Sequence, residues 1–297
     1  MLLRCTASRE GKLNTFLRRE LSMSSSLVSR LKWQNALLVN GAPAHTGHPV
    51  RTGDEVAVRL EETVEGFSPE EMPLSILYED EALIALDKPA GLLTHPSPCR
   101  NDGTLANGLL AYYQKTGQRC GIHPVSRLDR DTFGVVLLAK NAYVHEKFRQ
   151  LHQSGGIRKT YRACVYDVPD ADCGTIDLPV FKLGGGSLLR IVDVRGQQAV
   201  TEFAVLRRWK RTALLALHPI TGRTHQLRLH CLASGWPILG DPQYATDASR
   251  AYSAQCGIAP QQLCAAELAF THPLTGEAVR ILSQQDVLCP EAEDSRL

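Results

Sequence analysis

The sequence contains no long apolar run. No stretch of its 297 residues approaches the ~18 consecutive apolar residues that a membrane-spanning helix needs. Residues 1–3 lead directly into charged residues, without the apolar segment of a signal peptide. We therefore expect no membrane span and no secretion signal.

Paired cysteines are also lacking. The nine cysteines are an odd number, scattered from Cys5 to Cys289, and no two have C-x-x-C spacing. This pattern argues against a disulfide framework and against a structural zinc site. Reduced thiols in a cytoplasmic protein are the simplest account.

The chain has little net charge. Its 33 Lys and Arg residues nearly balance 31 Asp and Glu residues, which leaves a net charge of +2. Global basicity therefore gives no sign of a nucleic-acid partner. The hydrophobic fraction of 43% and the charged fraction of 22% are ordinary for a globular protein, and the length suits one large domain or two.

Signatures of several catalytic classes are missing as well. We find no Walker sequence, no dinucleotide-binding fingerprint and no Ser/His/Asp order. His225 and His230 are five residues apart, not the four of a helical metal-binding pair. We therefore expect no metal site.

The basic residues that are present concentrate at the start of the chain. Residues 1–60 hold nine Lys or Arg against four Asp or Glu, and nine minus four leaves +5. The spacing of apolar residues predicts two short helices, over 13–21 and 27–33. The segments 36–40 and 55–60 are typical of strands. We expect a small basic domain of two helices and a hairpin.

Four basic residues on these helices are candidates for contact with RNA. Arg18 and Arg19 should face outward from the first helix, and Arg30 and Lys32 lie on the second. A basic face of this kind suits the phosphate backbone of RNA. The alternative is a small solvated domain whose basic face is incidental.

Residues 61–73 differ in composition from the segments on either side. Five Glu residues crowd around Gly, Ser and two Pro residues. This composition indicates an extended acidic linker and a domain boundary that few contacts cross. We therefore divide the chain into a small N-terminal domain at 1–62, a linker at 63–73, a larger domain at 74–290 and a tail at 291–297.

The larger domain mixes strand and helix patterns. The predicted strands cover 76–78, 82–87, 135–139, 159–166, 200–206 and 212–217. The predicted helices cover 104–114, 143–151 and 224–233. Residues 170–198 are Gly-rich, and we expect them to be irregular.

One stretch combines charge with a rigid support. The polar cluster 126–132 runs straight into the apolar run 135–139, which predicts a loop that enters a buried strand. Asp129, with Arg127 and Arg130 beside it, should therefore lie at the mouth of a sheet, where loops often carry catalytic groups. A loop held by salt bridges, without chemistry, is the alternative.

Two further residues suggest chemistry. Tyr161 lies at the centre of a predicted strand, and Arg228 lies on an amphipathic helix. A carboxylate such as that of Asp129 can act as a nucleophile at a sugar carbon. An Arg partner can hold it ionised and oriented through a bidentate contact. These residue types alone do not select a reaction.

The motifs together resemble a known family. The run from Ser126 to Lys140, beginning Ser-Arg-Leu-Asp-Arg-Asp-Thr-Phe-Gly, is similar to the signature of the RNA pseudouridine synthases of the large-subunit-rRNA type, the A class of that superfamily. Further blocks follow in the family's order, at 86–91 with 95–96, 159–163, 221–230, 237–244 and 272–277. Residues 1–62 resemble the alpha-L RNA-binding module of a small-subunit ribosomal protein, through 24–32, 38–41 and 50–58.

The resemblance implies an α+β protein. Its catalytic domain would have a mixed, mostly antiparallel sheet and would follow a small alpha-L RNA-binding domain. The implied activity is the isomerisation of specific uridines to pseudouridine in structured RNA, either rRNA or tRNA. An isomerisation needs no cofactor. We expect a monomer with RNA as its partner.

The resemblance also implies a role for each site residue. Asp129 corresponds to the catalytic aspartate, which acts to break the glycosidic bond and lets the base rejoin through carbon. Tyr161 corresponds to the tyrosine that packs on the uracil and is proposed to assist proton removal. Arg228 corresponds to the arginine that pairs with the aspartate, and Arg127 to the arginine that can occupy the space of the flipped nucleotide. Extrusion of a base from a helix costs about a few kcal/mol.

The chain departs from the family pattern at two positions. Ser126 stands where the family usually has His, and Phe133 stands where it usually has Ser. These changes reshape the loop and bear on target choice more than on activity. His123 could partly substitute for the missing histidine, although a plain loop histidine is the simpler interpretation.

Two other functions remain open on the sequence. A non-catalytic RNA-binding or ribosome-assembly protein could use the same scaffold. A glycosidase-like hydrolase would need a second carboxylate across the bond from Asp129, and only Asp131 or Asp241 could supply it.

Overall fold

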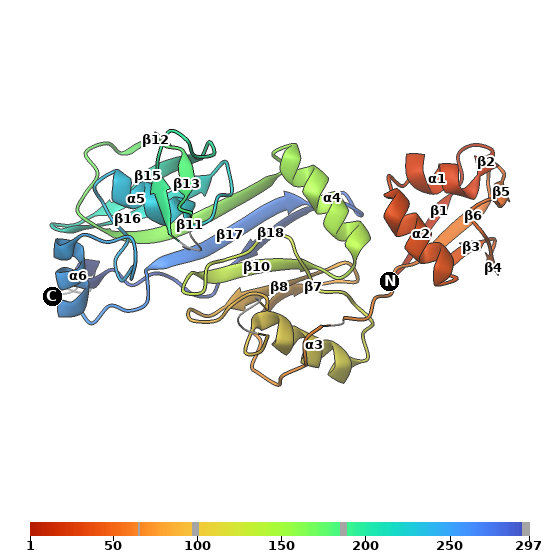
Figure 1. Cartoon of the computed structure of the whole chain (residues 1–297), viewed down its shortest axis with the longest axis horizontal. Coiled ribbons are helices and arrows are strands. Elements are labelled where there is room, and N and C mark those ends of the chain that lie inside the picture. The colour runs from red at the N-terminus through yellow and green to blue at the C-terminus, as the bar shows by residue number, and fades with distance from the viewer. Residues whose placement is uncertain (65, 97–100, 185–188, 293–297) are drawn as a thin grey trace.

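The structure, a computed structural model, describes residues 1–64, 66–96, 101–184 and 189–292. The molecule is elongated (Figure 1), with an N-terminal unit, residues 1–60, at one end and a larger unit built around a long sheet. Across the described ranges, no helix is both long enough and apolar enough to cross a membrane.

The N-terminal unit combines two helices with a four-stranded sheet. Its elements are β1 (Leu2–Thr6), β2 (Gly11–Lys12), α1 (Leu13–Arg19), α2 (Ser25–Trp33), β3 (Leu37–Val39), β4 (Ala42–Pro43), β5 (Pro49–Val50) and β6 (Glu55–Arg59). The sheet has the order β1-β6-β3-β4, and β2 pairs with β5. Both predicted helices and both predicted strands are present. Strand β1 was not predicted, and it pairs along its whole length with β6.

Helix α2 shows how the local sequence sets the fold of this unit. Ser24 accepts a hydrogen bond from the backbone N–H of Leu27 at 3.2 Å, which satisfies one of the free N–H groups of the first turn. Leu27 and Leu31 are buried. Arg30 and Lys32 are therefore left on the exposed side of the helix.

The larger unit is organised around a ten-stranded sheet. Its strands are β7 (Ile76–Glu79), β8 (Leu83–Lys88), β9 (His123–Pro124), β10 (Phe133–Ala139), β11 (Ile157–Tyr166), β12 (Cys173–Asp177), β15 (Val200–Arg208), β16 (Thr212–Pro219), β17 (Leu263–Thr271) and β18 (Ala278–Leu282). The order is β12-β15-β16-β11-β17-β10-β8-β7, with β18 beside β17 and β9 beside β10. Strands β10 and β17 pair in parallel, and the other named pairs are antiparallel. The predicted α+β fold with a mixed, mostly antiparallel sheet is confirmed.

Helices cover this sheet at several points. They are α3 (Leu105–Thr116), α4 (Ala142–Gln153), α5 (Gln226–Ala233) and α6 (Asp247–Gln255), and a short 3-10 helix spans Pro290–Ala292. Helix α4 lies on the side of the N-terminal unit, and α5 and α6 lie at the opposite end of the molecule (Figure 1). Three of these helices were predicted, and α6 was not.

The expectation of an irregular segment over 170–198 is wrong in part. Strand β12 lies within it, and so does a separate hairpin of β13 (Val180–Lys182) and β14 (Arg190–Val192). These strands have three to five residues each, which is too short for a periodic apolar pattern to develop. Tertiary pairing therefore decides their conformation.

The segment expected to be a free linker is packed against the larger unit. The backbone N–H of Gly103 lies 3.1 and 3.0 Å from the two carboxylate oxygens of Glu70. Asn107 Nδ2 donates to the Ser68 carbonyl at 2.7 Å, and Phe67 packs on the core beneath α3. These contacts attach the segment to the larger unit, whereas its acidic composition predicted an extended linker.

A single carboxylate, that of Glu62, joins the two units. Its Oε1 accepts hydrogen bonds from Arg30 Nη2 at 2.7 Å and from the backbone N–H of Ala142 at 2.9 Å. Its Oε2 lies 2.5 Å from Nε2 of His123. These partners belong to α2, α4 and β9, so one side chain connects three elements from both units.

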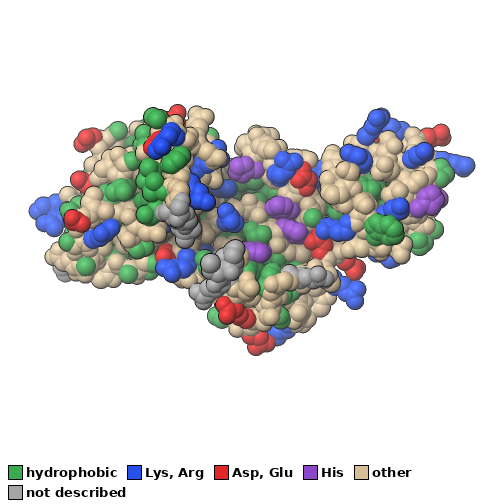
Figure 2. All heavy atoms as spheres, viewed as in Figure 1, with side chains coloured by type: hydrophobic (Ala, Val, Ile, Leu, Met, Phe, Trp, Pro, Cys, Tyr) green, Lys and Arg blue, Asp and Glu red, His purple; other side chains and the backbone are tan. Residues whose placement is uncertain are grey.

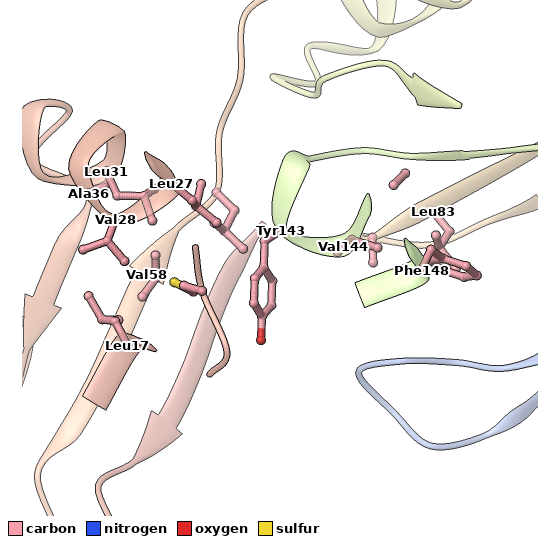
Figure 3. Packing of buried hydrophobic residues seen from close by; sticks show 14 of the residues in the cluster. Leu17, Leu27, Val28, Leu31, Ala36, Val58, Leu83, Tyr143, Val144 and Phe148 are labelled. Carbon is pink, nitrogen blue, oxygen red and sulfur yellow. The ribbon is translucent and has the colours of Figure 1, made fainter. Parts of the chain in front are cut away.

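The apolar core also continues from one unit into the other. Tyr143, in the first turn of α4, projects between Leu17 on the N-terminal side and Leu83 and Phe148 on the other (Figure 3). Its hydroxyl donates to the Leu21 carbonyl at 3.0 Å. The two units therefore share one buried cluster in this structure.

The expected C-terminal tail is described only at its start. Glu291 Oε2 accepts hydrogen bonds from the backbone N–H groups of Arg211 and Thr212, each at 3.0 Å. Residues 293–297 lie outside the described residues. The beginning of the tail is thus attached to the hairpin between β15 and β16.

Candidate active site

Asp129 lies in the loop that joins β9 to β10, as the sequence predicts. Leu128, before it, is buried in the core. The fully buried Lys88 donates to three backbone carbonyls, including that of Arg130 at 2.8 Å. Burial lowers the pKa of Lys88 to about 8, although the charges of Asp131 and Asp129 oppose the shift. The loop is therefore anchored on both sides of Asp129.

Arg228 lies on α5 and reaches Asp129, but its stronger contact is with another carboxylate. Its Nε and Nη2 donate to the two oxygens of Asp241 at 2.6 and 2.8 Å. Its Nη1 donates to Asp129 Oδ2 at 3.2 Å. The expected bidentate contact is therefore made with Asp241, which occupies the Nε and Nη2 edge of the guanidinium and leaves Nη1 for Asp129.

The pair of Arg228 and Asp241 is buried and fully bonded. Asp241 Oδ1 also accepts the backbone N–H groups of Gln243 and Tyr244 at 2.8 and 2.9 Å. Burial would raise the pKa of Asp241, but the Arg228 hydrogen bond and charge lower it overall. Burial also opposes the charge of Arg228, yet its contacts with Asp241 and Asp129 raise its pKa. Both groups stay charged, which holds Nη1 in place.

Asp129 is less satisfied than these neighbours. Its side chain is 28% exposed. Oδ2 accepts the Arg228 bond and lies 3.9 Å from Nε2 of His225. Among the residues that the structure describes, none donates a hydrogen bond to Oδ1. The carboxylate is thus oriented from one side and open on the other.

Tyr161 lies on β11 close to this carboxylate. The register of β11 against β17 shifts between Thr160 and Tyr161, and such a bulge can re-aim a side chain. Burial, followed by the charge of Asp129, raises the pKa of Tyr161, so the phenol stays protonated at neutral pH. Arg127 is exposed on the Asp129 loop. The structure thus gathers Asp129, Tyr161 and Arg228 and leaves Arg127 at the surface.

The four candidate RNA contacts of the N-terminal unit are all exposed, namely Arg18, Arg19, Arg30 and Lys32. Arg30 is also paired with Glu62. Lys32 Nζ lies 5.3 Å from the ring centre of Trp33, and Trp33 is 79% exposed. In the space-filling view, Lys and Arg side chains gather over this unit (Figure 2). Trp33 was not predicted to matter, although a tryptophan in a polar run was a usable signal.

The other candidate groups already have hydrogen-bond partners of their own. Both oxygens of Asp241 are occupied, and the two oxygens of Asp131 accept from Arg130 Nε and Nη2, each at 3.0 Å. A hydrolase with a free second carboxylate is therefore disfavoured. His123 bonds to Glu62, so it does not substitute for a histidine beside Asp129.

Sequence reasoning missed three features of this site. Asp241 was considered only as a rival carboxylate, and its bond to Arg228 was not foreseen. His225 was considered only as a metal ligand, and Tyr244 had no role. A usable signal was the motif 237–244, which contains both Asp241 and Tyr244. The left-handed backbone of His225, with φ of 59°, has no sequence signal.

The chain is similar to several known proteins. Residues 82–233 match the model of the RNA pseudouridylate synthase family. The RNA pseudouridine synthase YjbO of Bacillus subtilis is 34% identical over 88% of this chain and 91% of its own. Ribosomal large subunit pseudouridine synthase D of Neisseria meningitidis is 33% identical over 91% of this chain and 74% of its own. The structure of human RNA pseudouridylate synthase domain containing 4 has a TM-score of 0.58 and 26% identity, and covers 71% of this chain and 88% of its own.

Proposed function

This chain belongs to the RNA pseudouridine synthase family, and we propose that Asp129 carries the reaction. The family's enzymes are isomerases that convert uridine to pseudouridine in RNA. In that conversion the bond from N1 of the base to C1′ of the sugar breaks and a bond from C5 to C1′ forms. The C5 proton is released and N1 gains a proton, so the product has the composition of the substrate.

The observation that carries this proposal is the half-occupied carboxylate. Arg228 holds Oδ2 of Asp129 at 3.2 Å, while Oδ1 has no hydrogen-bond donor among the described residues. A carboxylate held by an Arg on one oxygen and open on the other suits attack at an electrophilic carbon of the nucleotide. Arg228 is itself held by Asp241, so its hydrogen bond to Oδ2 of Asp129 is in place before RNA binds.

The other residues would act on the nucleotide around Asp129. The ring of Tyr161 serves as the packing surface for the uracil, since its raised pKa keeps the phenol neutral. Arg127, exposed on the same loop, fills the space left by the extruded nucleotide. The target uridine must leave its stack for its sugar carbon to be reached, at a cost of about a few kcal/mol.

The N-terminal unit would bind the same RNA as a clamp of the alpha-L type. Arg18, Arg19 and Lys32 offer exposed positive charges, and Trp33 offers an exposed aromatic ring on which a base can stack. Arg30 would join them while it also anchors the unit through Glu62.

The substrate, location and assembly are part of the same proposal. The substrate is a structured rRNA or tRNA, and the name of the Neisseria relative favours rRNA of the large subunit. We place the enzyme in the cytoplasm, where such RNA is matured. It would act as a monomer, because one chain supplies Asp129, Tyr161 and Arg228.

The test is Asp129→Asn, which keeps the shape of the side chain and removes its charge. We expect tritium release from [5-³H]uridine RNA to fall by more than about 10³-fold, with RNA affinity within a few-fold of normal. Asp131→Asn is the matched control, since Asp131 is a neighbouring carboxylate paired with Arg130, and it should stay active. Appreciable turnover by Asp129→Asn would falsify the assignment.

A further inference from the structure

A chain of polar contacts reaches Asp129 from outside the residues assigned above. The backbone N–H of Arg190, the first residue of β14, donates to Tyr244 Oη at 2.9 Å. Tyr244 Oη lies 2.9 Å from Nδ1 of His225. The other ring nitrogen of His225, Nε2, lies 3.9 Å from Asp129 Oδ2. These contacts connect a strand outside the main sheet with the carboxylate.

The contacts of Tyr244 determine which ring nitrogen of His225 carries the proton. The Tyr244 hydroxyl accepts the N–H of Arg190, and within the described ranges His225 Nδ1 is the acceptor it can reach. Tyr244 is buried, and a buried donor without an acceptor is costly. The hydroxyl therefore donates to Nδ1. A neutral imidazole then carries its proton on Nε2, the nitrogen that faces Asp129.

Two further observations fit this arrangement. Burial lowers the pKa of His225, although the charge of Asp129 opposes the shift, so the neutral ring is favoured. His225 has φ of 59° at the N-terminus of α5, a left-handed conformation that costs energy for residues other than glycine and recurs at functional sites. The Tyr244 ring centre lies 5.5 Å from the imidazole centre, and its hydroxyl lies 2.9 Å from Nδ1, so Tyr244 contacts the His225 side chain in two ways.

We propose that His225 is a positioning residue for Asp129. Its Nε2–H and Arg228 Nη1–H together hold Oδ2, so that Oδ1 faces the target uridine. The inference rests on the proposed catalytic role of Asp129. The present separation of 3.9 Å is too long for a hydrogen bond, and a small rotation of the carboxylate on RNA binding would close it. Tyr244 acts one step further out, by fixing the tautomer of His225.

A pair of substitutions separates positioning from a structural role. The amide nitrogen of Gln reaches about as far as Nε2 of His, whereas that of Asn reaches only as far as Nδ1. Asn is the better residue for a left-handed backbone. A structural role therefore favours His225→Asn, and a positioning role favours His225→Gln. We expect His225→Asn to lower kcat on the order of 10- to 100-fold with KM unchanged, and His225→Gln to recover most of that loss.

The kinetic result can overturn the proposal in two ways. If His225→Asn turns over at the wild-type rate, the nitrogen facing Asp129 is not needed. If the Gln and Asn variants lose kcat equally, or if the loss appears only in KM, His225 has a structural or RNA-binding role. Circular dichroism of both variants confirms that each is folded before the rates are compared.

A spectroscopic readout tests the tautomer without activity. In the full chain labelled with ¹⁵N-histidine, long-range proton–nitrogen spectra report which ring nitrogen carries the proton. We expect the Nε2–H form for His225, and a mixture of both forms in Tyr244→Phe. An Nδ1–H form in the wild type would overturn this inference and leave the role of Asp129 standing. An active Asp129→Asn would overturn the proposed function whatever tautomer is found.

Discussion

Two acidic side chains of this protein have the same kinds of neighbour and differ in how fully they are bonded. Glu62, between the two units, and Asp129, in the loop before β10, each lie beside one Arg and one His. For Glu62 the Arg and His nitrogens are 2.7 and 2.5 Å from the carboxylate. For Asp129 the corresponding distances are 3.2 and 3.9 Å.

The difference separates an architectural carboxylate from a reactive one. Glu62 is 12% exposed and accepts bonds on both oxygens, so its charge is used within the fold. Asp129 is 28% exposed and is bonded on one oxygen. A group left partly unsatisfied contributes less to stability and remains free for a substrate, which is the usual compromise at functional sites.

Apart from replacement of Asp129 itself, the largest expected effect comes from disturbing the support of Asp129. Arg228→Lys keeps the charge but loses the planar fork, so a single ammonium must serve both Asp241 and Asp129. We expect the rate at saturating RNA to fall by about 10²-fold or more, as misplacement of a catalytic group by about 1 Å can cause. Stability should fall by about 1–3 kcal/mol, because Asp241 is left partly unpaired in a buried site. Tritium release and chemical denaturation measure the two effects.

Arg162→Lys is the matched control for Arg228→Lys. Arg162 follows Tyr161 on β11 and pairs with Asp286 at the surface, so its replacement should leave both rate and stability nearly unchanged. Equal behaviour of the two variants would mean that the fork of Arg228 has no special role. Asp241→Asn should lower rate and stability in the same way as Arg228→Lys, because the fully buried Asp241 holds Arg228.

The sequence predicted the position of Asp129 but not what holds it. A polar cluster followed directly by an apolar run is a local pattern, and it correctly indicated a loop that enters a buried strand. The bond from Arg228 to Asp241 joins a helix to a loop through tertiary folding. The sequence indicated Asp129 alone as the partner of Arg228, and only the fold shows that Asp241 meets the forked edge.

The sequence was misleading for Glu62 for a related reason. Its acidic, proline-containing surroundings are typical of a free linker, yet its partners lie 32, 61 and 80 residues away in the chain. A prediction from composition cannot detect single contacts between residues that are so far apart in the sequence. The resemblance named Asp129, Tyr161 and Arg228, which lie close together in the structure, whereas the contacts that join the two units have no local pattern.

A smaller effect is expected at the joint between the units. Glu62→Gln removes the charge that Arg30 and His123 face, and we expect a loss of about 1–2 kcal/mol at neutral pH, reduced by the exposure of Arg30. Glu61→Gln is the control, since Glu61 is half exposed and lies 3.6 Å from Arg119. Denaturant melts of both variants measure the difference, and equal stabilities would contradict an architectural role for Glu62.

The stabilities of wild type and Glu62→Gln can also be compared as a function of pH. Burial would raise the pKa of Glu62, but the hydrogen bonds from His123 and Ala142 lower it below the ordinary value of 4.5. A carboxyl with a lowered folded-state pKa stabilises the protein above its unfolded pKa and loses that contribution as the pH falls through the folded value. The gap in stability between wild type and Glu62→Gln should therefore be widest near neutrality and should close below about pH 4.5. A gap that widens in acid would contradict this assignment.

The smallest effect should appear in RNA binding by the N-terminal unit. Replacing Arg18, Arg19 and Lys32 together with Ala leaves the contacts of Glu62 intact. Removal of the whole N-terminal unit would break the contact between Glu62 and Arg30. Each lost phosphate contact should reduce the log–log salt slope of binding by roughly 0.7–0.9. Turnover at saturating RNA should change little. Titration at several salt concentrations decides the point.

A charge-matched control makes that titration specific. Lys115, Arg149 and Arg280 are exposed basic residues on α3, α4 and β18. Their joint replacement by Ala removes the same charge from the larger unit. If both triple variants lose the same slope, the attraction of RNA is general and the N-terminal unit is no clamp.

The central claim is that Asp129 serves chemistry and Glu62 serves the fold. The most direct measurement determines tritium release at saturating RNA and unfolding free energy in the same preparations of Asp129→Asn and Glu62→Gln. The account predicts a crossed result: Asp129→Asn loses activity and unfolds with nearly the wild-type free energy, while Glu62→Gln is less stable and retains turnover when folded. An Asp129→Asn protein that still releases tritium, or that loses activity only in proportion to its stability, would contradict the account.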